Sequence, residues 1–89
     1  MATITFKMKI APEETIVIAP AFKHSHCNMQ EFRNHSKYGA YAKSNLFLSL
    51  LARVRRDLFG SCGIIRLDNL PKNVTIDRSG FLAVVTIKL

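Results

Sequence analysis

Residues 45–59, NLFLSLLARVRRDLF, limit the possible folds more than any other part of this chain. Their apolar side chains recur at the three- and four-residue spacing of an amphipathic helix, at Leu46, Phe47, Leu50, Leu51, Val54 and Leu58. The rotation of about 100° per residue places Asn45, Ser49, Arg53 and Arg56 on the opposite side. The segment therefore predicts one helix with an apolar stripe and a basic face, and the stripe needs a second layer to cover it.

Two strands are predicted before this helix. Residues 2–10 (ATITFKMKI) alternate apolar side chains with Thr and Lys, which is typical of a strand with one buried face and one basic, wet face. Pro12, Glu13 and Glu14 interrupt this alternation, and residues 15–19 (TIVIA) predict a second strand. A hairpin is the simplest connection between the two strands.

The next segment predicts a loop and then a helix start. Residues 22–27 show no regular period, which favours a loop. Asn28 followed by Glu31 has the spacing of a helix N-terminal capping box, with Asn28 as the N-cap. The spacing predicts a helix that begins at Met29.

Gly39 leaves two alternatives for this part of the chain, because a glycine weakens a helix by about 1 kcal/mol relative to Ala. A short first helix stops near Tyr38 and the main helix restarts around Ala42, or one helix covers residues 29–59. The single helix would be roughly 45 Å long. A compact domain of this size is only about 25–30 Å across. The comparison favours a break, or at least a kink, at Gly39.

Three more strands are predicted after the main helix, at residues 63–67, 74–77 and 81–89. Gly60 is placed to end the helix as its C-terminal glycine, and basic side chains in the last turns complement the helix dipole. Residues 77–80 (DRSG) suit a tight turn in which Gly80 takes a positive φ. A hairpin is therefore predicted between the last two strands.

The predicted element order is β-β-α-β-β-β, which indicates an α+β fold. We expect a two-layer sandwich in which an antiparallel sheet of about five strands carries one main helix on one face. A chain of 89 residues accommodates one such domain, so residues 1–89 are expected to form a single domain.

The composition favours a small basic protein of the cytoplasm. The formal net charge is +7, which raises the expectation of a polyanionic partner. No apolar run reaches the roughly 18 residues that a membrane span needs, and the N-terminal pattern is not that of a signal peptide. Cys27 and Cys62 are expected to be reduced thiols, a single disulfide between them being the alternative.

The sequence offers weak signals for catalysis or metal binding. His24, His26 and Cys27 are zinc-ligand types, but no second ligand pair stands at a defined spacing, so a polar loop is favoured over a metal site. His26 and Cys27 are adjacent and therefore point to opposite sides of an extended chain, which disfavours a Cys/His nucleophile. No cofactor is expected, and the protein is not expected to be an enzyme.

The strongest functional signal is a basic, partly aromatic segment around the main helix. Arg side chains form paired hydrogen bonds to phosphates, and aromatic rings beside them stack on bases. The sequence therefore predicts a small binding protein whose helix-borne Arg cluster contacts nucleic acid or a nucleoprotein complex. The candidate contact residues are Arg53, Arg55, Arg56, Lys37, Lys43, Tyr38 and Tyr41.

The alternative prediction is a protein-interaction module, such as an inhibitor or accessory subunit, that binds an acidic protein surface. Apolar anchors such as Tyr38, Phe22 or Phe81 would then contribute beside the charge. The aliphatic last strand and an exposed sheet edge also make a homodimer a fair expectation.

Overall fold

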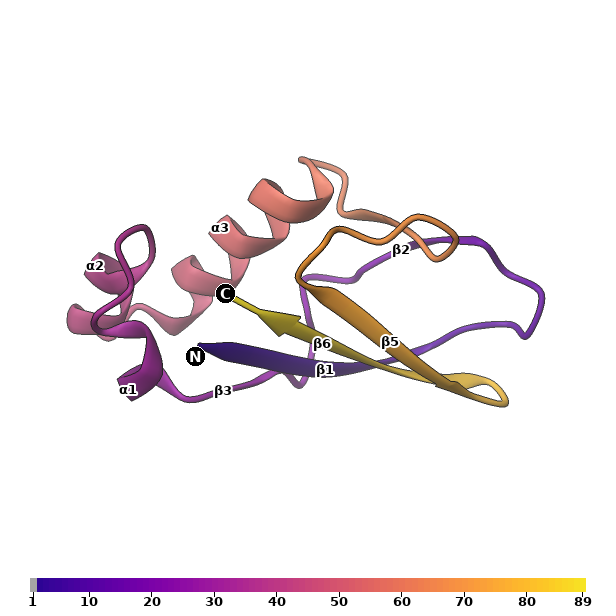
Figure 1. The fold of residues 1–89 in the computed structure, drawn as a ribbon, viewed down its shortest axis with the longest axis horizontal. Coiled ribbons are helices and arrows are strands. Elements are labelled where there is room, and N and C mark those ends of the chain that lie inside the picture. The colour runs from indigo at the N-terminus through magenta and orange to yellow at the C-terminus, as the bar shows by residue number, and fades with distance from the viewer. Residues whose placement is uncertain (1) are drawn as a thin grey trace.

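A computed structural model describes residues 2–89, which form six strands and three helices (Figure 1). The strands are β1 (Thr3–Lys9), β2 (Ile16–Ile18), β3 (His26–Cys27), β4 (Ile64–Arg66), β5 (Val74–Ser79) and β6 (Leu82–Lys88). The helices are α1 (Met29–Phe32), α2 (Gly39–Lys43) and α3 (Phe47–Phe59). The fold is an α+β domain with antiparallel strand pairs and α3 as its main helix, so the predicted fold class is confirmed.

The main sheet has the strand order β3-β1-β6-β5. β1 and β6 pair along their whole length, so that Ile4 lies opposite Ile87 and Phe6 opposite Val85. These four side chains are buried, whereas the Thr and Lys side chains of β1 on the other face are exposed or half-buried. The alternation in residues 2–10 thus predicted correctly one apolar and one basic face.

α3 covers the apolar face as its sequence period predicts. Leu50, Leu51 and Val54 are buried and join the same core cluster as the inward residues of β1 and β6. Burying each such side chain contributes about 1.5–3 kcal/mol. Gly60 ends the helix with a φ of 80°, and its N–H donates to the carbonyl of Arg56.

The predicted hairpin between residues 2–10 and 15–19 is wrong. β2 pairs instead with β4, where Val17 lies opposite Ile65, and these two strands form a separate two-stranded sheet. β1 instead pairs along its whole length with β6, through seven pairs of residues. The strands therefore divide into a four-stranded and a two-stranded sheet.

Residues 22–27 are not wholly a loop, because His26 and Cys27 form β3 and pair with Thr5 and Ile4 of β1. The chain before β3 turns sharply through left-handed backbone at Ala21, Phe22 and His24, with φ of 51°, 50° and 58°. Sequence periodicity does not register a two-residue strand.

The helix is broken around Gly39, as favoured, but it forms three helices and not two. α1 begins at Met29, and the Asn28 side chain accepts from the Gln30 N–H at 3.0 Å as the predicted N-cap. Gly39 begins α2 instead of ending a helix. A Cβ there would lie 2.9 Å from the carbonyl oxygen of Arg33, so the close approach of the two segments requires glycine.

The predicted hairpin between the last two strands is confirmed, with a shifted turn. β5 runs on to Ser79, which pairs with Leu82, so the turn consists of Gly80 and Phe81. Gly80 has a φ of 59°, and positive φ at the first of two turn residues suits a tight hairpin.

Candidate nucleic-acid interface

α2 and α3 together form a shallow depression on the surface. It has a volume of about 320 Å³ and is lined by Tyr41, Ser49, Ala52, Arg53 and Arg56. Arg53 and Arg56 are three residues apart on α3 and so share one helix face. Tyr41 comes from α2, which packs against α3. The structure therefore brings together two of the predicted arginines and one of the predicted tyrosines.

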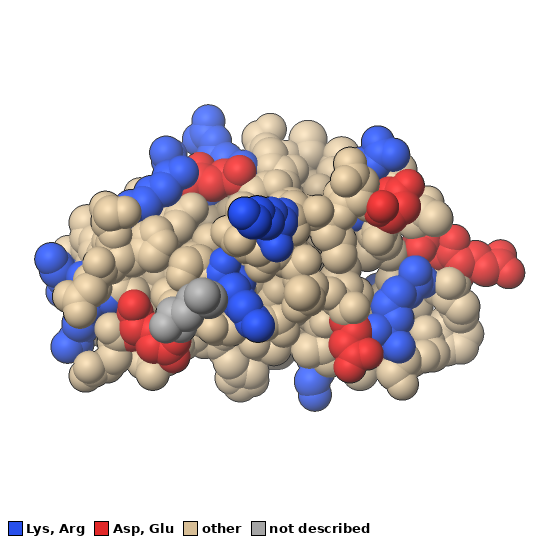
Figure 2. All heavy atoms as spheres, in the orientation of Figure 1, with Lys and Arg blue, Asp and Glu red and all other residues tan. Residues whose placement is uncertain are grey.

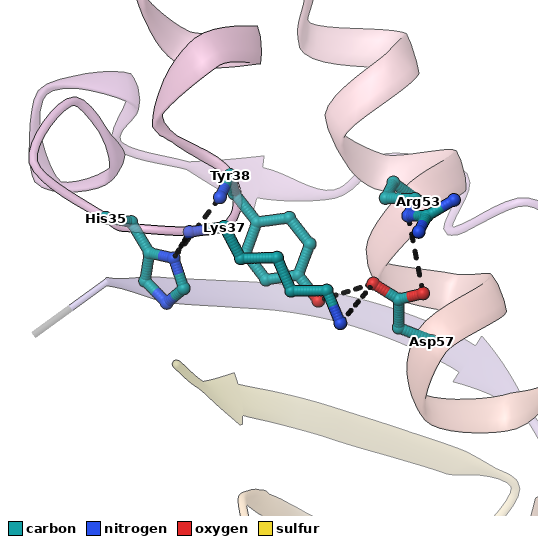
Figure 3. Close-up of polar contacts among 5 residues, drawn as sticks. All are labelled: His35, Lys37, Tyr38, Arg53 and Asp57. Carbon is teal, nitrogen blue, oxygen red and sulfur yellow. Dashed lines mark hydrogen bonds and ion pairs between the residues drawn. The ribbon is translucent and has the colours of Figure 1, made fainter.

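An acidic side chain, Asp57, joins this face to the segment before α2 (Figure 3). Its Oδ2 lies 3.1 Å from the Lys37 ammonium, and its Oδ1 lies 3.4 Å from Nε of Arg53. The Tyr38 hydroxyl donates to the same Oδ2 at 2.9 Å. One carboxylate thus lies within ion-pair distance of two predicted cations.

The charge balance at Asp57 remains positive. The Asp57 side chain is 16% exposed. Its partial desolvation opposes ionisation, but the hydrogen bonds from Lys37 and Tyr38 and the charge of Arg53 outweigh this effect and lower the pKa of the carboxyl. Asp57 is therefore ionised at neutral pH and neutralises one of its two cationic neighbours. Across residues 2–89, Arg56 and Lys43 have no ion pair, so both add uncompensated charge to this region.

Tyr38 lies in the core. It is 3% exposed, and its ring makes an edge contact with Phe32 at a centroid distance of 6.4 Å. Burial, together with the hydrogen bond to Asp57, raises its pKa to about 12. A buried ring offers no face to a nucleobase, so the structure gives Tyr38 the role of positioning Asp57.

Arg55 points away from the depression. Its Nε donates to the carbonyl of Ala19 at 3.0 Å and its Nη2 to the carbonyl of Cys62 at 3.3 Å. The guanidinium also occupies the space beside Gly63, where a Cβ would lie 2.3 Å from Nη2. Arg55 therefore ties α3 to the β2–β4 sheet, and the structure does not bring it together with Arg53 and Arg56.

Figure 2 shows how charge is spread over one face of the molecule. Several Lys and Arg side chains gather around an acidic group at its upper left edge, over α3. Other basic side chains lie farther along the surface, several of them beside acidic groups. The net charge of +7 is thus not confined to a single patch.

His24, His26 and Cys27 do not converge. His26 lies on the open face of the main sheet, whereas Cys27 pairs with Ile4 and turns toward the core. Within residues 2–89 no three His, Cys, Asp or Glu side chains are grouped closely enough to hold a metal ion. Burial, with Glu31 nearby, raises the pKa of the Cys27 thiol to about 11, which disfavours the thiolate. Cys27 and Cys62 are both free thiols.

Sequence reasoning missed Asp57, which organises the site. The signal was present, because Arg53 and Asp57 are four residues apart on a predicted helix, and oppositely charged side chains at this spacing pair. The contacts with Lys37 and Tyr38 had no such signal, because they depend on how the chain before α2 folds back onto α3.

The chain matches no protein-family model, and it shows no significant similarity to a curated protein or to a solved structure. Among the helices formed by residues 2–89, none has the length and apolar content to cross a membrane.

Proposed function

We propose that this protein binds nucleic acid, by itself or within a nucleoprotein complex, through the basic face of α2 and α3. The proposal rests on one observation, the depression where Tyr41, Arg53 and Arg56 meet. Lys37 and Lys43 border this face and supply further charge. Arg55 and Tyr38 are left out of the contact set, since both are engaged in holding the fold.

The chemistry of these residues suits a phosphate backbone. The planar guanidinium groups of Arg53 and Arg56 each present several donors to phosphate oxygens. Asp57 restricts Arg53, so less side-chain freedom is lost when a phosphate binds. The Tyr41 ring at the edge of the depression is available to stack on a base in a single strand.

The proposed activity is binding and not catalysis, and the proposed location is the cytoplasm. The two free thiols support a reducing compartment. Arg53, Arg56 and Tyr41 carry groups that bind anions and stack on bases, and this chemistry supports binding.

A second candidate function is the binding of an acidic protein surface at the same face. It is favoured by Leu46 and Leu48, which are 49% and 79% exposed at the start of α3. Phe81, which is 72% exposed, lies in the β5–β6 turn, and Phe22 is buried, so neither extends this apolar patch. A protein partner would use these leucines as anchors, whereas nucleic acid would depend on the cations.

The test is fluorescence anisotropy with generic RNA and DNA oligonucleotides at several salt concentrations. We expect micromolar binding at low salt, and the Arg53→Ala/Arg56→Ala variant should weaken it and reduce the slope of log K against log salt by about 1 per arginine. The matched control, Lys72→Ala/Lys88→Ala, removes the same charge from exposed positions outside this face. Equal losses in both variants would mean that only net charge matters, and no binding at low salt would refute the proposal.

A further inference from the structure

A groove lies between β1 and β2, on the side of the molecule away from the helices. It has a volume of about 740 Å³, within the usual range for ligand sites. The chain leaves β1, makes a wide loop and returns through β2 without pairing with it (Figure 1). Figure 2 also shows the surface hollowed in the right half of the molecule, away from the helices. We call this site the β1–β2 groove and describe it by Lys7, Lys9, Ile16, Ile18, Lys23 and His24.

The β1 side of the groove is an open strand edge. The Leu89 N–H donates to the carbonyl of Ala2, and the Ile10 N–H donates to the carbonyl of Phe81. Because alternate residues of a strand point their backbone groups to the same side, the even-numbered residues of β1 bond to β6. The backbone groups of Lys7 and Lys9 point the other way. On that side β3 pairs only with Ile4 and Thr5.

The β2 side of the groove is a second open edge. The Leu67 N–H donates to the carbonyl of Thr15, and the Ala19 N–H donates to the carbonyl of Gly63. Alternate residues of a strand point their backbone groups to the same side, so Thr15, Val17 and Ala19 face β4. The backbone N–H and C=O groups of Ile16 and Ile18 therefore point away from β4, and both residues line the groove.

The loop before β3 keeps the groove open. An extended His24 would continue the β3 ladder opposite Lys7, but His24 has a φ of 58° and leaves the strand. The buried ring of Phe22 stacks on Phe6 at a centroid distance of 4.4 Å and fixes the loop in this path. The open edges are thus part of the fold, and no strand formed by residues 2–89 covers them.

We propose that an extended, acidic peptide segment of a partner protein inserts into the β1–β2 groove as an added strand. It would bond to both edges and join the two sheets into one, as in other cases of strand addition. Three residues of β1, Lys7 to Lys9, and the three residues of β2 border the groove. At about 3.3 Å per residue, each edge allows a contact about 10 Å long. This proposal concerns a different surface from the basic face of α2 and α3 and does not depend on it.

The side chains of the groove favour an acidic occupant. Three lysines and one glutamate, Glu14, are among the lining residues, so the local charge is positive. Ile16 and Ile18 are 53% and 67% exposed and offer apolar contacts beside the charge. Paired free backbone edges suit a peptide, which has matching N–H and C=O groups, better than a nucleic acid, which lacks them.

The test begins with selection of short random peptides, displayed on phage, against the whole protein at physiological salt. We expect enrichment of peptides that alternate Asp or Glu with β-branched residues. Binding should fall about tenfold in Lys7→Ala/Lys9→Ala, and also in Ile18→Pro, which removes an edge N–H at a position where edge strands accept proline. Ile18→Ala is the matched control that keeps the N–H, and it should bind more tightly than Ile18→Pro.

Hydrogen exchange on the unmodified protein gives a readout that does not depend on the variants folding. With a selected peptide bound, the amides of Lys7, Lys9, Ile16 and Ile18 should exchange at least about tenfold more slowly. Failure to enrich peptides, or unchanged exchange at these amides, would overturn the proposal. It would equally be overturned by a dimer that Ile18→Pro dissociates, or by an oligonucleotide whose binding Lys7→Ala/Lys9→Ala abolishes, because each assigns the groove to another occupant.

Discussion

The hydroxyl of Tyr38 donates a hydrogen bond of 2.9 Å to Oδ2 of Asp57, which lies 19 residues later in the chain. This contact joins the segment before α2 to the last turns of α3. It also sets the carboxylate between Lys37 and Arg53 (Figure 3). A buried tyrosine thereby determines how two surface cations are arranged.

Tyr38→Phe tests the value of this contact. The variant keeps the ring in the core and removes only the hydroxyl, so the free energy of unfolding should fall by about 1 kcal/mol. Urea denaturation measures the change. Tyr41→Phe is the control, because no hydrogen bond involves the Tyr41 hydroxyl within residues 2–89. Equal stability of the Tyr38→Phe variant and the wild type would contradict a net contribution of this hydrogen bond to stability.

The pKa of Asp57 predicts an acid-sensitive stability. Because the folded protein lowers this pKa below the unfolded value of about 4, the contribution is present above that pH and is lost as the pH falls through the folded pKa. The stability difference between the wild type and Asp57→Asn should therefore shrink below about pH 4. Urea midpoints measured across this range check it, and a difference that grows on acidification would contradict it.

The raised pKa of Tyr38 predicts that stability is also lost at alkaline pH. Its pKa is raised to about 12 in the fold, so its contribution is present below the unfolded value of about 10 and is lost as the pH rises from there toward 12. Tyrosinate absorbance of the native protein, compared with that of the Tyr38→Phe variant, should show that Tyr38 ionises above its unfolded value of about 10. A Tyr38 that ionises at its unfolded value would be inconsistent with its burial.

The two cysteines should differ in reactivity. Cys62 is exposed, whereas Cys27 is partly buried and its pKa is raised to about 11. A thiol reagent at pH 8 should therefore label Cys62 first, and Cys27 should react only after unfolding. Mass spectrometry of the labelled peptides measures the order. Faster labelling of Cys27 would show that its environment is more open than described.

The Phe22 ring should be a major source of stability. It is 1% exposed and contacts both Phe6 and Phe59, so Phe22→Ala should cost about 3–5 kcal/mol. Phe81→Ala, at a side chain that is 72% exposed, should change stability by less than about 0.5 kcal/mol. Denaturation curves compare the two, and similar losses would place Phe22 outside the core.

Local patterns predicted the regular elements well. The helical period of residues 45–59 and the alternation of residues 2–10 gave α3 and β1 with the correct buried faces. Asn28 and Gly60 marked helix ends through their own backbone and side-chain preferences. Each of these signals acts over a few residues, so a single sequence contains it.

Long-range partners could not be predicted in the same way. β1 pairs with β6 and not with β2, and no local pattern of residues specifies which strand an edge of β1 meets. The left-handed residues Ala21, Phe22 and His24 are not glycines and gave no turn signal. At the candidate site, the positions of Tyr38 and Arg55 likewise depend on segments distant in sequence.

The most direct test of the proposed function is a titration of the isotope-labelled protein with a single-stranded oligonucleotide, followed by amide and side-chain NMR shifts. We expect the largest shifts to fall on Tyr41, Arg53 and Arg56, and to disappear in Arg53→Ala/Arg56→Ala. Shifts concentrated instead at Lys7, Lys9 and Ile18, or no shifts at low salt, would contradict the assignment of nucleic-acid binding to the face of α2 and α3.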